Sequence, residues 1–151
     1  MEPIKPNVDL DWFRTRSAWA DAGAFVTIAD IQPLERGTVI ANELGAELGV
    51  RCKYVWSDVT KWGSQVAAFQ AALAASPFCV LDVVITFAGV CVQPGSLLDL
   101  VQAAGEPTRH TAPPQPDTAN VDVNLEGAYY TAWLAMCYLR LEGEPNPSVP
   151  I

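Results

Sequence analysis

AGAFVTIAD, residues 22–30, is the stretch that decides the fold class of this 151-residue chain. Gly23 supplies a turn, and residues 24–29 then form a nearly continuous apolar run. Such a run, without alternating polar side chains, is typical of a parallel strand that is covered on both faces. Asp30 follows where the strand would end. The stretch therefore predicts a buried strand with a carboxylate at its carboxyl end.

Helical segments flank this strand on both sides. A helix is expected over residues 10–21, and a second helix is expected to begin at Pro33 and to end at Gly49. A proline fits the first turn of a helix because its missing N–H would have no partner there. The apolar positions of the second helix predict one buried face, made of Leu34, Val39, Ile40, Leu44 and Leu48.

The same alternation continues through the middle of the chain. Residues 50–59 read as a second strand, and a helix capped by Thr60 is expected to end before Pro77. A third strand is expected in LDVVITFAGV, residues 81–90. Strands that alternate with helices indicate a parallel α/β sheet.

The last third of the chain is less regular. Residues 92–118 are rich in Pro, Gly and Gln, with one short helix expected within residues 95–105. A long amphipathic helix is expected over residues 120–141, followed by a tail at residues 142–151. The apolar positions of this helix are spaced by three and four residues and comprise Val121, Leu125, Ala128, Tyr129, Ala132, Met136 and Leu139.

Composition limits the classes of partner. The net charge of −8 and the pI of about 4.4 argue against nucleic acid and anionic membranes, because both are negative. The four cysteines are widely spaced without a CxxC pair, so neither a metal site nor a disulfide is expected. No secretory signal is recognised at the start, and no apolar run approaches the ~18 residues of a membrane span, so we expect a cytoplasmic protein.

Four short motifs occur in an order that carries a family resemblance. They are VTIAD at 26–30, SDVT at 57–60, VVITFAG at 83–89 and VDVNLEGAYYTAWLA at 121–135. Together they resemble the short-chain dehydrogenase/reductase family, over about residues 20–141. The run DVTKWGSQVAAFQAALAASP at 58–77 and the stretch GEPT…VDVNLEGAYYTAWLA within 105–135 look most like fungal NAD-dependent alcohol dehydrogenases. The resemblance implies a Rossmann-like sheet, an oxidoreductase acting on a secondary alcohol or ketone, and a nicotinamide dinucleotide as cofactor.

The resemblance also implies roles for single residues. Asp30, with Ile31 beside it, would bind the adenosine ribose and favour NAD over NADP, because a carboxylate repels the extra phosphate. Asp58 and Val59 would flank the adenine. The cofactor would lie against Phe87, Ala88 and Gly89, and Asn124 would be a remnant of the family's proton relay. Thr86 and Phe87 depart from the family pattern, which usually has two asparagines there.

Each of these positions also fits a purely structural role. Asp30 could serve as the N-cap of the helix that begins near Pro33, and Asp58 could cap the helix near Thr60. Gly89 could only turn the chain, and Asn124 could be an ordinary residue near a helix start. His110 lies in a proline-rich loop and is expected to be solvated.

Several family features have no counterpart in these residues. No glycine precedes Gly23, so the glycine-rich turn that binds pyrophosphate is absent, and Pro3 and Pro6 disfavour a first strand. Four residues after each tyrosine stands Asp58, Trp133, Leu134 or Glu142, so no Tyr-x-x-x-Lys dyad exists. The expected catalytic serine is missing too.

We therefore predict a single partial Rossmann-like domain over residues 1–151, an α/β parallel sheet with flanking helices. Its first strand and its C-terminal strands are missing, and residues 1–9 are irregular. The leading hypothesis is a truncated, inactive relative of an NAD-dependent oxidoreductase, with weak or lost cofactor binding. The alternative is a catalytically dead interaction module that dimerises, or pairs with a full-length homologue, through the helix at 120–141.

Overall fold

The computed structural model describes residues 23–91, 97–105 and 108–149. The helix expected at residues 10–21 and the irregular segment at 1–9 lie outside these ranges. Within them, β1 (Phe25–Asp30) and β2 (Arg51–Trp56) pair in parallel, from Phe25 opposite Arg51 to Asp30 opposite Trp56. This confirms the predicted α/β class with a parallel sheet and flanking helices.

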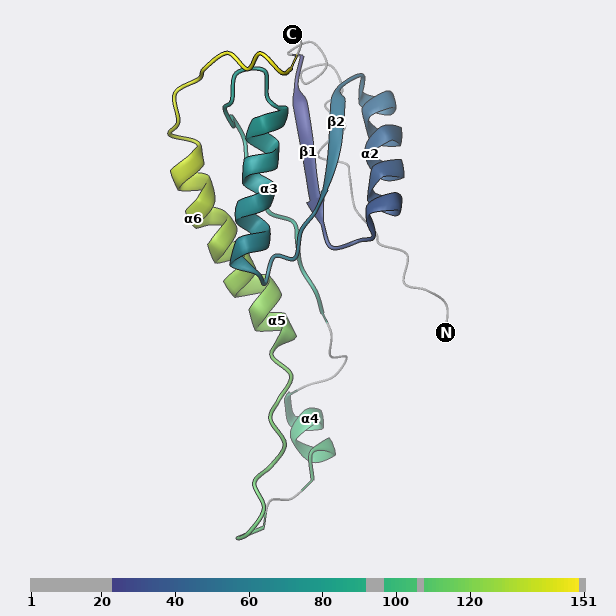
Figure 1. The fold of residues 1–151 in the computed structure, drawn as a ribbon. Coiled ribbons are helices and arrows are strands. Elements are labelled where there is room, and N and C mark those ends of the chain that lie inside the picture. Colours follow the sequence, from purple (N-terminus) through teal and green to yellow (C-terminus); the bar gives the residue numbers. More distant parts are fainter. Residues whose placement is uncertain (1–22, 92–96, 106–107, 150–151) are drawn as a thin grey trace.

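Helices cover the two faces of this sheet (Figure 1). On one face lies α2 (Leu34–Leu48), which connects the two strands; on the other lie α3 (Trp62–Ala75) and α6 (Ala128–Tyr138). Because both strands point the same way, their carboxyl ends meet at one edge of the sheet. That edge carries Asp30 and Asp58.

The helix α2 has the expected bounds, but only Leu44 and Leu48 of its predicted face are buried. Its buried residues are Gly37, Ala41, Leu44 and Leu48, whereas Leu34, Val39 and Ile40 are exposed. Small residues let the helix approach β2 closely: a Cβ built on Gly37 would lie 2.2–2.3 Å from the Tyr54 ring. The close approach of α2 to β2 therefore decides which face of the helix is buried, rather than the number of large apolar side chains on each face. Gly49 ends the helix in the left-handed conformation, with φ 66°.

The helix α3 begins differently from the prediction. Its N-cap is Lys61, without a side-chain capping hydrogen bond, so the expectation that Thr60 caps it is wrong. Instead, the backbone N–H and hydroxyl of Thr60 both donate to the Asp58 carboxylate, at 2.9 and 2.8 Å. The Thr60 hydroxyl is therefore occupied in the preceding turn.

The third predicted strand does not form in the part of the chain that the structure describes. Residues 80–91 run as an extended trace without strand pairing, and Val83, Ile85 and Phe87 are 54%, 45% and 64% exposed (Figure 1). A strand exists only where a neighbour satisfies its N–H and C=O groups. In the described residues the sheet consists of β1 and β2, which pair with each other and not with this segment.

The short helix expected within residues 95–105 is α4 (Leu97–Ala103). The long C-terminal helix also forms, in three consecutive parts: α5 (Ala119–Val121), a π-helical segment η2 (Asp122–Gly127), and α6. The apolar positions picked out by the spacing lie largely on the exposed side of this long helix. The exposed apolar side chains along it include Val121, Leu125, Tyr129, Met136 and Leu139.

The long helix instead packs through its other face. Gly127 and Leu134 are its buried residues, and aromatic contacts join it to α3: Trp62 with Tyr130, and Phe69 with Tyr138, at centroid distances of 5.5 and 5.3 Å. The helix is apolar on two faces, and the periodicity could not say which one meets the core.

The segment after α6 lies against the C-terminal end of α3. The Asn146 side-chain amide donates to Ala74 O and Ser76 O, both at 3.1 Å, and its backbone N–H donates to Pro77 O. Over the described ranges, none of the helices is both long enough and apolar enough to cross a membrane.

Candidate functional site

The candidate site lies at the carboxyl edge of the sheet. Asp30 ends β1, and the turn after β2 begins with Ser57, whose N–H donates to the Asp30 carbonyl oxygen at 2.8 Å. Parallel pairing therefore brings Asp30 close to Asp58 and Val59. Ile31, next to Asp30, is 58% exposed.

Asp30 presents an exposed carboxylate. Its Oδ1 atom accepts a hydrogen bond from the Gln32 N–H at 2.9 Å. The N-cap of α2 is Pro33, and no side chain caps that helix, so the alternative role of Asp30 as its N-cap is wrong. The carboxylate instead orders the loop after β1 while remaining at the surface.

Tyr54, which the sequence analysis did not single out, holds the loop after β1 in place. Its buried hydroxyl oxygen lies 2.7 Å from the Asp30 carbonyl oxygen and 2.6 Å from that of Gln32, and its single hydrogen is shared between these two acceptors. Burial, with a smaller contribution from the Asp30 charge, raises the pKa of this tyrosine above its ordinary value of 10.0. The hydroxyl therefore stays protonated and keeps its hydrogen bonds. A tyrosine in the middle of the second predicted strand was the available sequence signal.

Asp58 organises the turn between β2 and α3. Oδ1 accepts both hydrogen bonds from Thr60, and the Asp58 N–H donates to Ser64 Oγ at 2.9 Å. The alternative that Asp58 caps α3 is wrong, because the N-cap is Lys61; the carboxylate instead orders the turn that precedes the helix. Both hydrogen bonds from Thr60 use the same oxygen, so this turn does not require Oδ2.

Gln65 is a second residue that sequence reasoning missed. This side chain, 3% exposed, donates from Nε2 to Val59 O at 2.6 Å and to Gly127 O at 2.9 Å. Its Oε1 accepts from the Thr131 hydroxyl at 2.8 Å. The amide therefore ties the Asp58–Val59 turn to η2. A glutamine on an otherwise apolar helix face was its only sequence signal.

Gly127 allows η2 to lie directly against that turn. A Cβ at this position would lie 2.9–3.2 Å from the side chain and carbonyl oxygen of Val59. Such distances are shorter than ordinary contacts, so a larger residue would separate η2 from Val59. The glycine sets the spacing at this side of the site.

Asn124, also on η2, holds the extended segment that contains Phe87, Ala88 and Gly89. Its Oδ1 accepts from the Val90 N–H and its Nδ2 donates to the Val90 carbonyl oxygen, both at 2.8 Å. This paired hydrogen bond stands in for the strand pairing that the segment lacks. The side chain is therefore more than an ordinary residue near a helix start.

Gly89 has no structural need for glycine in its described surroundings. Its backbone is not left-handed, unlike that of Gly23, Gly49 and Gly105. An added Cβ would meet Asn124 Oδ1 at 3.5 Å and Phe87 O at 3.9 Å, which are ordinary contacts. The alternative that Gly89 only turns the chain therefore has no support from a left-handed backbone at this residue.

The structure thus places Asp30 and Asp58 at one edge of the sheet, and η2 connects the Asp58–Val59 turn to the segment that precedes Val90. Asp30 and Ile31 come from β1, Asp58 and Val59 from the turn after β2, and η2 contacts both Val59 and the segment before Val90. Exposed carboxylates at the ends of parallel strands can accept hydrogen bonds from ribose hydroxyls, and small side chains let a ligand approach the backbone.

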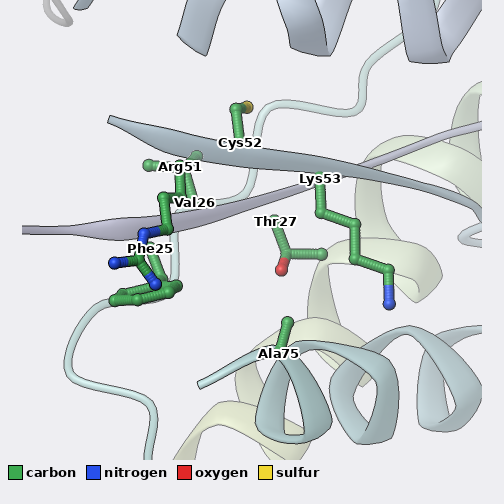
Figure 2. Close-up of a pocket in the computed structure, with 7 residues that line it drawn as sticks. All are labelled: Phe25, Val26, Thr27, Arg51, Cys52, Lys53 and Ala75. Carbon is green, nitrogen blue, oxygen red and sulfur yellow. The ribbon is translucent and has the colours of Figure 1, made fainter. Parts of the chain in front are cut away.

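A cavity of about 170 Å³ lies elsewhere, near the amino ends of the strands (Figure 2). Phe25, Val26, Thr27, Arg51, Cys52, Lys53 and Ala75 line it. The guanidinium of Arg51 lies 4.6 Å from the centroid of the Phe25 ring. In open α/β sheets ligands bind outside the carboxyl ends of the strands, so this cavity is separate from the candidate site.

Known proteins with similar sequences are fungal dehydrogenases. The chain is 44% identical over 158 residues to 5'-hydroxyaverantin dehydrogenase of Dothistroma septosporum, covering 94% of this chain and 51% of the relative. It is also 44% identical over 169 residues to a protein of the same name from Emericella nidulans, covering 99% and 53%. The chain spans about half the length of these relatives.

More distant relatives carry broader names. A short-chain dehydrogenase/reductase of Penicillium rubens is 33% identical over 115 residues, covering 76% of this chain and 37% of the relative. Two others, from Phoma sp. and Cochliobolus lunatus, are named NADP-dependent dehydrogenases. No protein-family model matches the chain.

Proposed function

The chain is related by sequence to fungal members of the short-chain dehydrogenase/reductase family, and on that premise we propose that its carboxyl edge forms the adenosine side of a nicotinamide-dinucleotide site. The whole protein would be an oxidoreductase acting on a secondary alcohol or ketone. The observation that carries this proposal is the exposed Asp30 carboxylate at the end of β1, beside the Asp58–Val59 turn.

The residues present fit the adenosine half of the cofactor. Asp30 would accept hydrogen bonds from the ribose, while Asp58 and Val59 would flank the adenine. Phe87, Ala88 and Gly89 would line the opposite wall, and an added Cβ at Gly89 would meet the protein only at ordinary distances. The paired hydrogen bonds between the Asn124 side chain and the Val90 backbone would hold the segment at Phe87, Ala88 and Gly89 in place.

The residues present give less support for binding of the diphosphate half of the cofactor. A glycine-rich turn presents free backbone N–H groups to phosphates, and no glycine precedes Gly23 in the printed sequence. We therefore propose that these 151 residues bind NAD no better than at millimolar concentration.

The reaction also lacks a proton donor and acceptor in these residues. The cofactor, when bound, exchanges a hydride with the substrate carbon, and a side chain of matched pKa must exchange the proton. The sequence holds no Tyr-x-x-x-Lys pair. Asn124 would be the remnant of the family's proton relay, but its side chain is occupied by Val90. We propose that these residues alone do not catalyse the oxidoreductase reaction.

The charge of Asp30 predicts a preference for NAD, although two relatives are named NADP-dependent. Calorimetric titration with ADP-ribose and with its 2'-phosphate should show roughly tenfold tighter binding of the first, a difference of about 1.4 kcal/mol. Asp30→Asn should remove most of that difference, because the repulsion disappears.

Asp82→Asn is the matched control, since it removes the same charge from an exposed position at the far end of the segment leading to Gly89. It should leave the preference unchanged. Equal or tighter binding of the phosphorylated compound by the unaltered chain would contradict the proposed role of Asp30.

The second candidate function is an interaction module that dimerises or pairs with a full-length homologue. It is favoured by the exposed apolar side chains of the long helix, including Leu125 at 66%, Tyr129 at 61% and Trp133 at 49% exposure. Contiguous exposed apolar surface is typical of protein interfaces. This function does not require cofactor binding.

Light scattering after size exclusion tests the second function. We expect the mass to rise with protein concentration, and Leu125→Glu with Tyr129→Glu to restore the monomer by placing charges in the interface. Gln70→Glu adds a charge at an exposed position on α3, outside the long helix, and should preserve association. A monomer at every concentration, with or without a homologue, would exclude this function.

A further inference from the structure

Residues 108–118 form a loop whose side chains are all exposed, and it projects away from the sheet and its helices (Figure 1). Neither the proposed cofactor site nor the exposed face of the long helix uses this loop. Its sequence, TRHTAPPQPDT, contains three prolines within four positions. An exposed segment of this composition is a candidate for recognition by another protein.

The loop begins with a tight turn. Thr108 and Thr111 form an isolated antiparallel bridge, their hydroxyl oxygens lie 2.6 Å apart, and the His110 N–H donates to Thr108 Oγ1 at 3.2 Å. Arg109 and His110 occupy the tip of this turn. The turn therefore fixes a cation directly before the proline-rich segment.

The backbone of residues 112–116, APPQP, is restricted by its prolines. Each proline fixes φ near −65°, and the residue before a proline is excluded from the helical region. These effects together restrict all five residues to extended, polyproline-type conformations, and the structure assigns neither helix nor strand to residues 112–118. Little conformational entropy remains to be lost when such a segment binds.

A polyproline helix has three residues per turn, so Pro113 and Pro116 lie on the same side. Ala112 precedes Pro113, and Gln115 precedes Pro116, so the segment contains two X-Pro units three residues apart. Two X-Pro units at this spacing match the PxxP pattern that docks into aromatic-lined grooves of SH3-type modules. Arg109 upstream adds a cation that an acidic rim of such a groove would attract.

We propose that residues 109–117 are a docking segment for an SH3-type, proline-recognising protein module. The segment is exposed, residues 112–117 carry neither helix nor strand, and the loop lies apart from the edge that carries Asp30. Its role is independent of cofactor binding, so either proposal can fail without the other.

The test titrates the purified 151-residue chain against a panel of purified SH3 domains, with tryptophan fluorescence and calorimetry as readouts. At least one domain should bind saturably. The double variant Pro113→Ala, Pro116→Ala should weaken that binding more than tenfold, because truncation of each anchoring side chain costs over about 1 kcal/mol.

Two control variants make the result specific. Gln115→Ala keeps all three prolines and should bind within about twofold of the unaltered chain. Pro145→Ala removes an exposed proline outside the loop and should also leave binding unchanged. Failure of every SH3 domain to bind, or equal binding by the double-proline variant, would overturn the proposal.

Discussion

Replacing Gln65 with leucine is expected to lower the free energy of unfolding by about 2–4 kcal/mol, the largest effect that we predict for a single side chain. Leucine leaves the Val59 carbonyl oxygen without its 2.6 Å hydrogen bond and removes one donor from Gly127 O. Each buried polar group left unsatisfied costs about 1–3 kcal/mol. The Thr131 hydroxyl limits the loss, since it also lies 3.0 Å from Gly127 O.

Gln70 provides the matched control, because it is an exposed glutamine on the same helix. Gln70→Leu should change stability by no more than about 0.5 kcal/mol. Gln65→Glu keeps the acceptor for Thr131 but loses both donors, so it should be nearly as damaging as leucine. Urea denaturation followed by circular dichroism measures all three, and equal stability of the two leucine variants would refute the proposed bridge.

The second large effect is expected at Gly37. Alanine there would place a Cβ 2.2–2.3 Å from the Tyr54 ring, which cannot move easily because its hydroxyl is bonded to Asp30 O and Gln32 O. Overpacking of this kind costs about 1–3 kcal/mol. The substitution should also disturb the loop that carries Asp30, because Tyr54 holds that loop.

Gly63→Ala is the control for the helix propensity of alanine. No atom lies within 4 Å of the Cβ that this change adds, so it should be neutral or stabilise α3 by up to ~1 kcal/mol. Combining Gly37→Ala with Tyr54→Leu should remove the additional cost of Gly37→Ala, since the ring is gone. If Gly37→Ala is as stable as Gly63→Ala, the close approach of α2 to β2 is not as described.

Local signals predicted most of the elements. The apolar run that ends at Asp30 became β1, Pro33 and Gly49 bounded α2, and the spacing over residues 120–141 predicted one long helix. These features depend on near neighbours in the sequence. Parallel pairing then placed Asp30 and Asp58 at one edge, as expected from the strand directions.

Apart from the helix-cap roles considered for Thr60, Asp58 and Asp30, which are local, the errors concern contacts between distant residues. The segment at 80–91 had the apolar character of a strand, but strand formation depends on a neighbour that the described sheet does not provide. Leu34, Val39 and Ile40 of the predicted α2 face are exposed, while the helix meets Tyr54 through Gly37; likewise η2 meets Val59 through Gly127, which apolar spacing does not reveal. Tyr54 is bonded to Gln32, 22 positions away, and Gln65 to Gly127, 62 positions away. Hydrophobic periodicity does not encode such pairs.

Titration of the ¹⁵N-labelled 151-residue chain with NAD, followed by amide chemical shifts, tests the central claim most directly. We expect the amides of Asp30, Ile31, Asp58, Val59 and Gly89 to shift together, with a millimolar dissociation constant, because the adenosine wall is present without the glycine-rich turn. Micromolar affinity would contradict this account, as would shifts confined to the cavity lined by Phe25, Arg51 and Lys53.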